Sequence, residues 1–388
     1  MNIRQLRANE FELSSKLSEY AFRYTLTEEE KEIQRQQYNP EQHWGLFEEN
    51  ELQAKFALYP FQVYLHGTIM EMGGIASVST WPEHRRKGHV AALLKHALLE
   101  MKNQGQTISF LHPFSVPFYR KYGWEVYAEY KKYEIEAHQL PERSEVQGKI
   151  VRDAADASVL DPIYQTFASR YNGTLVRDEL WWERKILKKG IHAAVYYSVE
   201  GEAQGYVLYE NKPKELICKE FVYLNEEART ALWSYLASHP ADWFKLNMVP
   251  ADDLLPFLLP EPRIKQELVP YFMARIVDFK PFIEQYTFKA GAKTELVLQL
   301  SDQIAVWNEG VWKLSIYEGG KGILERLPQD ASVAPDIIGD IQTFTAMLMG
   351  YKRPEELYLM KRLAGNPMKV TQLEHALPAR QTFFMDFF

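Results

Sequence analysis

The sequence predicts an α/β (α+β) protein built from three consecutive units, at residues 1–145, 146–287 and 288–388. Three observations support this. The chain has 388 residues, whereas a single domain usually has about 150. The order hairpin, strand, helix occurs twice in the first two thirds of the chain, with little residue identity between the copies. The last hundred residues instead show strands followed by helices, which is typical of an α+β domain.

The first unit mixes helices and strands. Apolar residues recur at helical spacing over 10–23, and Thr27 followed by three glutamates is typical of an N-cap and a first helical turn. Extended apolar runs and a second amphipathic helix follow. The expected strands are 44–47, 55–60, 70–80 and 107–112, and the expected helices are 10–23, a segment starting at 28, 90–101 and a short one within 113–122.

The second unit repeats this order. A turn containing Gly201 joins two of its strands, and a further strand precedes a helix. A basic loop, 82–88, precedes the corresponding helix of the first unit, and its counterpart here is only 225–228. This difference predicts one active unit and one supporting unit. The expected strands are 192–199, 203–209 and 216–224, and the expected helix is 226–239.

The third unit follows a connecting helix expected over 279–286. Asp336 is expected to cap one helix of this unit, and Pro354 to open another. The chain ends in an apolar, strand-like tail over 382–388. The expected strands are 294–300, 303–308 and 311–317, and the expected helices are 337–349 and 355–363.

Composition limits the class of function. The 45 basic and 52 acidic residues give a net charge of −7, which does not favour nucleic-acid binding. No stretch approaches the roughly 18 apolar residues of a membrane span, and we expect neither a membrane partner nor a signal peptide. The single cysteine, Cys218, cannot form an intrachain disulfide, so we expect a cytoplasmic protein.

The segment with the clearest chemistry is the basic loop Arg85-Arg86-Lys87-Gly88, which lies between a predicted strand and a predicted helix. The N-terminus of a helix has unpaired N–H groups and a partial positive charge, and it therefore favours phosphate. The three basic side chains add full charges, and glycine lets the backbone approach an anion closely. A solvated basic turn is the alternative interpretation, but the position of the loop favours a phosphate site.

Two motifs resemble those of the GNAT N-acetyltransferases. The segment 78–88 resembles the loop that binds the pyrophosphate of acetyl-CoA, with Arg85 and Gly88 at matching positions and Val90 where Gly or Ala is usual. The segment 117–124, Pro-Phe-Tyr-Arg-Lys-Tyr-Gly-Trp, is similar to the Phe-Tyr-x-x-x-Gly-Phe segment of the same family. The two motifs lie about thirty residues apart with a predicted helix between them.

The order of the three units resembles that of the Eis (enhanced intracellular survival) acetyltransferases, over essentially all 388 residues. This resemblance implies an active GNAT domain, a degenerate GNAT-like domain and a C-terminal sterol-carrier-protein-like domain. Members of that family acetylate amines, including several positions on aminoglycosides, and assemble as hexamers. The resemblance therefore implies a homo-hexamer that uses acetyl-CoA as co-substrate.

The resemblance also implies the residues that bind acetyl-CoA. The strand end is expected to donate hydrogen bonds to the thioester oxygen and the pantetheine arm. The loop is expected to hold the phosphates, and Lys87 and His89 to face solvent or the adenosine phosphate. The strand end comprises Val78, Ser79 and Thr80, and the loop comprises Arg85, Arg86, Lys87, Gly88, His89 and Val90.

The catalytic residues follow from the same resemblance. Tyr119 is the expected general acid, because a phenol with a pKa near 10 suits proton transfer to a thiolate; a core aromatic is the alternative. The terminal carboxylate of Phe388 is the expected general base, and a plain edge strand is the alternative. Asp386 could serve in its place. Glu28 and Glu29 could line an entrance that prefers polycationic substrates, although a helix N-terminus explains them equally well.

We therefore expect an acetyl-CoA-dependent N-acetyltransferase that acts on primary amines of small polycationic molecules. The histidines lack metal-ligand spacing, and no metal is expected. Two alternatives stay open. A protein or peptide lysine acetyltransferase would have a shallow groove that is open at both ends. A non-catalytic lipid-binding or scaffold protein with vestigial GNAT domains would have an apolar tunnel through residues 290–388.

Overall fold

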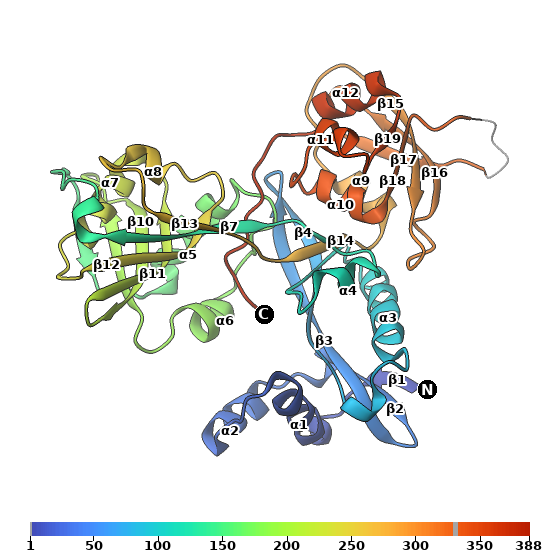
Figure 1. Ribbon diagram of the computed structural model, residues 1–388, viewed down its shortest axis with the longest axis horizontal. Helices are drawn as coiled ribbons and strands as arrows, with labels where there is room; N and C mark the ends of the chain where they lie inside the picture. The colour runs from blue at the N-terminus through green and yellow to red at the C-terminus, as the bar shows by residue number, and fades with distance from the viewer. Residues whose placement is uncertain (1, 329–332) are drawn as a thin grey trace.

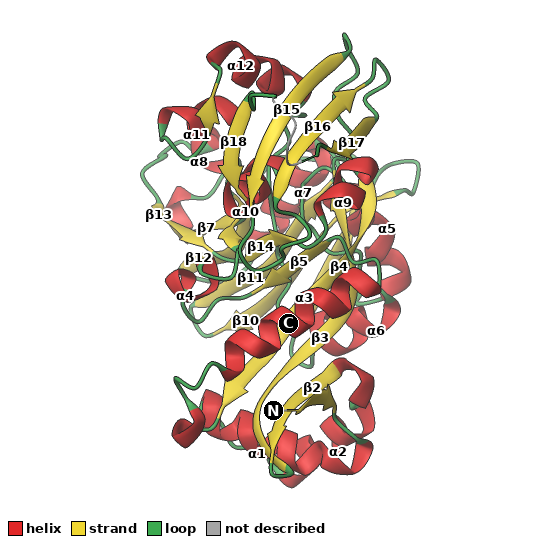
Figure 2. Ribbon diagram, turned by 90° about the vertical axis from the view of Figure 1, so that its right-hand side faces the viewer, coloured by secondary structure: helices red, strands yellow, loops and turns green. Residues whose placement is uncertain are grey.

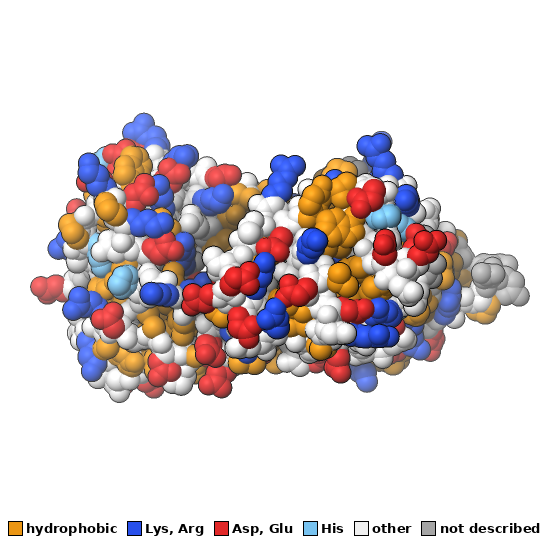
Figure 3. All heavy atoms as spheres, turned by 90° about the horizontal axis from the view of Figure 1, so that it is seen from below, with side chains coloured by type: hydrophobic (Ala, Val, Ile, Leu, Met, Phe, Trp, Pro, Cys, Tyr) orange, Lys and Arg blue, Asp and Glu red, His pale blue; other side chains and the backbone are white. Residues whose placement is uncertain are grey.

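The computed structural model describes residues 2–328 and 333–388, which form three domains, each built on one β-sheet. In Figure 1 the first domain lies at the bottom, the second at the left and the third at the upper right, and the last residues of the chain run between them. None of the helices in these two ranges has the length and apolar character needed to cross a membrane. On the face seen in Figure 3, acidic and basic side chains are interspersed.

The first sheet has the order β1-β2-β3-β4-β5-β14-β6, in which β4 and β5 are parallel neighbours. Helices α1 and α2 lie on one side of β3 and β4, and α3 covers the other side (Figures 1 and 2). The apolar face of α3, including Leu94 and Leu98, packs against buried residues of β2 and β3 such as Leu46 and Phe56. Thr27 caps α2 as expected, accepting a hydrogen bond from the N–H of Glu30. The bounds are β1 (Asn2–Gln5), η1 (Ala8–Glu10), α1 (Phe11–Phe22), α2 (Glu28–Gln37), η2 (Pro40–Gln42), β2 (His43–Glu48), β3 (Glu51–Leu65), β4 (Thr68–Thr80), η3 (Pro82–His84), α3 (His89–Asn103), β5 (Ile108–Leu111), α4 (Val116–Arg120), β6 (Glu125–Val126) and β14 (Met273–Ile276).

The second sheet has the order β13-β7-β12-β11-β10-β9-β8, and β11 and β12 are its parallel pair. It repeats the central arrangement of the first sheet, with α7 following β11 as α3 follows β4. The expected hairpin around Gly201 is confirmed by the antiparallel pairing of β9 with β10. The bounds are β7 (Glu129–Glu136), η4 (Ala137–Gln139), β8 (Lys149–Arg152), α5 (Ala157–Ala168), α6 (Glu179–Trp181), the π-helix η5 (Trp182–Ile186), β9 (His192–Tyr197), β10 (Ala203–Lys212), β11 (Glu215–Tyr223), α7 (Glu226–Leu236), β12 (Trp243–Pro250), α8 (Leu255–Leu258) and β13 (Lys265–Pro270).

The chain crosses twice between the first two sheets. β7 follows β6 in the sequence but pairs with β12 and β13 in the second sheet. β14 follows β13 but pairs with β5 and β6 in the first sheet. The strands of the second sheet therefore come from the continuous stretch 129–270, and the first sheet is completed by β14 from beyond that stretch.

The third domain packs helices on one sheet of order β17-β16-β15-β18-β19. Alternate residues of β15, namely Leu296, Leu298 and Leu300, are buried in a core that also contains Phe344 of α10. This alternation is the pattern of a sheet covered on one face. The bounds are α9 (Phe279–Gln285), β15 (Thr294–Ser301), β16 (Gly310–Ile316), β17 (Gly322–Arg326), β18 (Ile337–Asp340), α10 (Ile341–Leu348), α11 (Pro354–Leu359), β19 (Ala364–Gly365) and α12 (Pro367–Ala376).

Two expectations for this domain are wrong. The segment 303–308 is a series of turns and not a strand, because an oxygen of Asp302 accepts the N–H of Ala305 at 2.9 Å and closes a turn. The expected helix 337–349 begins as β18, which pairs in parallel with β15. Its helical part starts only at α10, where Asp340 and not Asp336 is the cap, accepting the N–H of Thr343 at 2.8 Å.

Candidate active site

The expected acetyl-CoA strand is unpaired along one edge. β4 pairs with β5 up to Ile75↔Leu111 and then continues to Thr80 beside β3 alone. A bulge interrupts the β3–β4 register here, and Ser77 has a positive φ of 52°. Within the described residues, no strand pairs with the β5-facing edge of Val78, Ser79 and Thr80. Their backbone groups on that edge are available to a ligand.

The basic loop leaves space for an anion at the start of α3. Gly88 is the N-cap of this 15-residue helix, with a φ of +84°, and no side chain caps it. A Cβ placed on Gly88 would meet no atom within 4 Å. Arg85, Arg86 and Lys87 are exposed, and in the described chain none of them forms an ion pair with a carboxylate. Uncapped N–H groups, unpaired cations and open space fit a pyrophosphate.

The side chain of His89 lies elsewhere than expected. It is buried, with 2% of its surface exposed, so the expectation that it faces solvent is wrong. Neither ring nitrogen has a hydrogen-bond partner in the described structure. His89 is the first residue of α3, and the loop before it contains a second left-handed residue, Arg86, with a φ of +64°. Val90 is partly buried beside it.

Replacing Gly88 with alanine is expected to weaken acetyl-CoA binding by about tenfold, or ~1.4 kcal/mol, since the added Cβ occupies the open space of the loop and the positive φ becomes strained. Gly105→Ala is the matched control. Gly105 also has a positive φ, +74°, and open space around it, but it lies at the other end of α3. Both variants should lose similar stability in thermal unfolding. Equal acetyl-CoA affinity in the two variants, measured by calorimetry, would show that the loop does not hold the phosphates.

Tyr119 lies on the short helix α4, within an aromatic cluster. Its ring centroid is 5.2 Å from that of Phe114 and 5.3 Å from that of Phe118, and 2% of the residue is exposed. Burial raises the pKa of Tyr119, so the phenol keeps its proton throughout the physiological range. The same apolar cluster contains Ile75 and Leu111, the last paired residues of β4 and β5. Tyr119 therefore belongs to the apolar cluster at the point where β4 and β5 separate.

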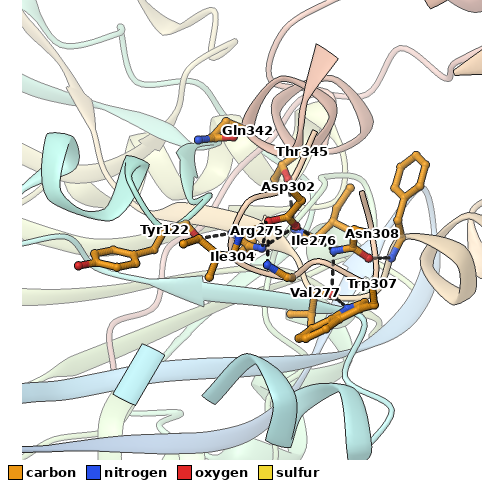
Figure 4. Close-up of polar contacts among 12 residues, drawn as sticks. Tyr122, Arg275, Ile276, Val277, Asp302, Ile304, Trp307, Asn308, Gln342 and Thr345 are labelled. Atoms are coloured by element: carbon orange, nitrogen blue, oxygen red, sulfur yellow. Dashed lines mark hydrogen bonds and ion pairs between the residues drawn. The ribbon is translucent and has the colours of Figure 1, made fainter. Parts of the chain in front are cut away.

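The third domain is linked to the C-terminal end of α4 directly and through β14 of the first sheet (Figure 4). Arg275 on β14 donates to the backbone oxygen of Tyr122 and forms a buried ion pair with Asp302, with N–O distances of 2.6 and 2.8 Å. Gln342 on α10 donates to the backbone oxygen of Arg120 at 2.8 Å. These contacts satisfy carbonyl groups that a helix end leaves free. The helix that carries Tyr119 is thus attached to a different domain.

The tail brings Phe388 against the first sheet. Its ring centroid lies 4.9 Å from that of Phe61 on β3 and 5.1 Å from that of Phe272. A Cβ on Gly74 would lie 2.7 Å from the Phe61 ring and 2.9 Å from the Phe388 ring, so glycine lets both rings approach β4 closely. Gly74 pairs with Phe110 one step before β4 and β5 separate. Phe388 therefore lies against β4 at Gly74, close to the start of the unpaired end of this strand.

Asp386 is held inside the second domain. One carboxylate oxygen accepts hydrogen bonds from Arg177 Nε at 2.9 Å and Trp181 Nε1 at 2.7 Å, and the other accepts from Tyr164 at 3.3 Å. Arg177 also pairs with Glu220 at 2.6 Å, and its side chain is fully buried. Burial raises the pKa of Asp386, and Arg177 opposes that rise. With both of its oxygens bonded, Asp386 is placed to anchor the tail rather than to accept a substrate proton.

The remaining predicted residues lie outside this group. Glu28 and Glu29 are exposed on the first turn of α2, a helix without buried residues, and Glu28 forms a surface ion pair with Lys31 at 3.5 Å. No group of three or more His, Cys, Asp or Glu side chains that could hold a metal ion occurs within residues 2–328 and 333–388. Cys218 is buried and unpaired.

Two residues near the strand opening were not identified from the sequence. Lys55 on β3 pairs with Ser79 across the ladder, and its Nζ donates to Ser14 at 2.7 Å and Ser18 at 2.6 Å. Burial lowers the pKa of Lys55 to about 7. His112, directly after β5, lies 5.1 Å from the Phe387 ring. A single lysine in a strand pattern gives no signal of burial, because most lysines are exposed.

Comparisons with protein families match all three domains. Residues 2–127 and 173–276 each match the description "Acetyltransferase (GNAT) domain", and residues 279–385 match "Sterol carrier protein domain". An uncharacterized N-acetyltransferase of Streptomyces griseus is 26% identical over 290 residues, which cover 66% of this chain and 69% of that protein. Another from Streptomyces avermitilis is 24% identical over 357 residues, covering 82% of this chain and 83% of that one.

A solved structure of a protein of Enterococcus faecalis described as a probable N-acyltransferase shares 31% identity, covers 100% of this chain and 99% of that one, and superposes with a TM-score of 0.93. The chain belongs to the GNAT acetyltransferase family. Eis1 of Mycobacterium abscessus has the same fold over the full length of both chains, at 20% identity and a TM-score of 0.83. This GNAT enzyme thus has an Eis-like arrangement of two acetyltransferase domains and a sterol-carrier-protein-like domain.

Proposed function

We propose that this acetyltransferase moves the acetyl group of acetyl-CoA to primary amines of small polycationic molecules, aminoglycosides among them. The observation that carries the proposal is the approach of Phe388 to Gly74, one step before the separation of β4 and β5. In the same domain, the Gly88 loop supplies the phosphate site. The resemblance to the Eis enzymes suggests the aminoglycosides, more than one acetylated position, a homo-hexameric assembly and a cytoplasmic location.

In the proposed mechanism, the terminal carboxylate of Phe388 is the general base and Tyr119 the general acid. The carboxylate, with a pKa near 3.5, is ionised at pH 7 and attracts a cationic amine before it accepts the amine proton. The neutral nitrogen forms a bond to the thioester carbon, while backbone N–H groups of 78–80 bind the developing oxyanion. The carbon–sulfur bond then breaks, and the thiolate takes the phenolic proton of Tyr119. The nitrogen loses its second proton as the amide forms, and this proton restores the phenol.

The third domain offers little support for a lipid carrier. Its groove of about 610 Å³ has a mixed lining, in which Lys289, Lys293, Glu295 and Lys369 place charges beside apolar residues such as Ile316. The inner face of its sheet is filled by α9 and α10, as the burial of Phe279 and Phe344 indicates. An apolar tunnel would need an unfilled core, so the proposed roles of this domain are to hold α4 and to deliver the tail.

We expect Tyr119→Phe to lower kcat about a hundredfold while leaving the affinity for acetyl-CoA nearly unchanged. The reduction is at the lower end for a lost general acid, because a thiolate with a pKa near 8.5 can leave without full protonation. Tyr122→Phe, three residues away and just beyond the end of the same helix, is the matched control. The measurement is CoA release with tobramycin, neamine and a lysine-rich peptide.

Each outcome of this assay tests one part of the proposed function. Equal turnover by the two phenylalanine variants would exclude Tyr119 as the acid. Turnover with the lysine-rich peptide but with neither aminoglycoside would replace the proposed substrates with protein lysines. If acetyl-CoA bound but none of the three amines led to CoA release, polycationic amines of this kind would be excluded as acceptors.

A further inference from the structure

The second domain has an opening where the first has its acetyl-CoA groove. β11 and β12 pair in parallel up to Cys218↔Leu246 and then separate, as β4 and β5 do after Ile75↔Leu111. A cavity of about 260 Å³ lies in this opening, lined by residues of β11, β12 and α7, with α8 and the end of α5 beside it. A volume of this size accommodates a small organic molecule.

The start of α7 is unsuited to a phosphate group. The side chain of Asn225 caps the helix by accepting the N–H of Ala228 at 2.9 Å. Glu226 and Glu227 place two carboxylates in the first turn, which is favourable for the helix but repels an anion. The corresponding position in the first domain, around Gly88, is uncapped and carries three cations. The two openings have the same topology and opposite electrostatics.

Aromatic side chains from three parts of the domain line the cavity. Phe221 and Tyr223 come from β11, Trp233 from α7, and Tyr171 follows α5. The ring centroids of Phe221 and Trp233 are 5.0 Å apart, and those of Phe221 and Tyr223 are 5.8 Å apart. The faces of such rings attract organic cations, and several rings around one space form the usual site for an ammonium group.

Two carboxylates complete the lining. Asp253 is partly buried and accepts hydrogen bonds from Tyr133 at 3.1 Å and from the N–H of Leu255 at 2.9 Å. Asp252 lies exposed at the rim, and in the described structure no side chain bonds to its carboxylate. The cation that lines the cavity, Arg229, is already paired with Glu226.

A second cation lies next to the cavity. Lys131 donates to the backbone oxygen of Asp253 at 3.1 Å, and not to its carboxylate. The charges of Arg229 and Glu226 cancel each other. The lining therefore retains the negative charge of its aspartates next to the aromatic faces.

We propose that this cavity binds a small organic ammonium ion, with the charge facing Asp252 and Asp253 and the alkyl groups against Tyr171, Tyr223 and Trp233. The site lies outside the acetyl-CoA groove and needs no acetyl transfer. The second GNAT domain is then a ligand-binding module. Its opening corresponds to the one that holds an anionic co-substrate in the first domain, but it binds a cation.

The test uses choline, which has no N–H to acetylate, and its neutral isostere 3,3-dimethylbutan-1-ol. Both are titrated by ligand-observed NMR into the full chain saturated with acetyl-CoA. We expect choline to bind at least about tenfold more tightly than the alcohol, and Asp252→Lys to remove choline binding. Glu145→Lys, the same charge change at an exposed site of this domain, should leave it unchanged.

Three results would overturn the proposal. Equal affinity for choline and the alcohol would show an unspecific apolar cavity. Choline binding that persists in Asp252→Lys would place the cation elsewhere, for instance in the amine site of the first domain. A stoichiometry of two acetyl-CoA molecules per chain would show that the second opening still holds the co-substrate. CoA release with the amines is measured separately in all variants, so loss of acetylation and loss of choline binding are distinguishable.

Discussion

Adding a single glycine after Phe388 is expected to lower kcat for amine acetylation by about 10²- to 10⁴-fold, the range for a lost general base. The extension moves the terminal carboxylate by one residue, or about 3.5 Å, while the Phe388 ring keeps its contacts with Phe61 and Phe272. Acetyl-CoA affinity should not change, because the loop around Gly88 is untouched. The measurement is single-turnover acetylation of neamine, with acetyl-CoA binding followed by calorimetry.

Two controls separate chemistry from packing in this experiment. Phe388→Leu keeps the carboxylate at its place but reduces the aromatic contact, and we expect it to lose far less activity than the extended chain. A glycine added before Met1 controls for a change in chain length. If the C-terminally extended chain turned over at the rate of the original, a residue other than Phe388 would have to accept the amine proton.

The sequence predicted the parts of the site that depend on local chemistry. The Arg85–Gly88 loop could be identified because glycine, basic residues and a following helix together are suited to phosphate binding, and the Tyr119 segment could be identified from its motif. The two crossovers between the first and second sheets could not be predicted. β7 and β14 read as ordinary strands, and nothing in their alternation specifies which of two similar sheets they join.

Pairings between residues far apart in the chain could not be predicted from the sequence either. Arg177 and Asp386 are more than 200 residues apart, and neither belongs to a motif. The alternation of the tail is likewise explained only by the fold: Phe383 and Met385 pack into the second domain, whereas Phe384 packs into the core shared by the other two. A tail with apolar residues at successive positions is buried on both sides, which a one-sided edge strand would not be.

Replacing Arg177 with methionine is expected to destabilise the fold by about 3–5 kcal/mol, the cost of leaving buried carboxylates without their counter-ion. Glu220 and Asp386 both pair with this guanidinium, and the side chains of Arg177 and Asp386 are fully buried. Asp386→Asn should cost much less, because an amide oxygen still accepts from Arg177 and Trp181 and the Arg177–Glu220 pair stays intact. Thermal unfolding of both variants measures the difference, and Arg263→Met, at an exposed arginine, should show no change.

The loss in Arg177→Met should depend on pH. Without the guanidinium, the folded-state pKa of Asp386, which burial already raises, rises further above that of the unfolded chain, near 4. A carboxyl shifted in this direction destabilises the fold progressively as the pH rises from its unfolded-state pKa to its folded-state pKa, so the deficit should be larger at pH 8 than at pH 5. Tail release should also reduce kcat/KM for amines at both pH values while acetyl-CoA affinity is retained. A deficit in stability that is the same at pH 5 and pH 8 would mean that Arg177 acts through packing on Tyr164 and Trp182 and not through its charge.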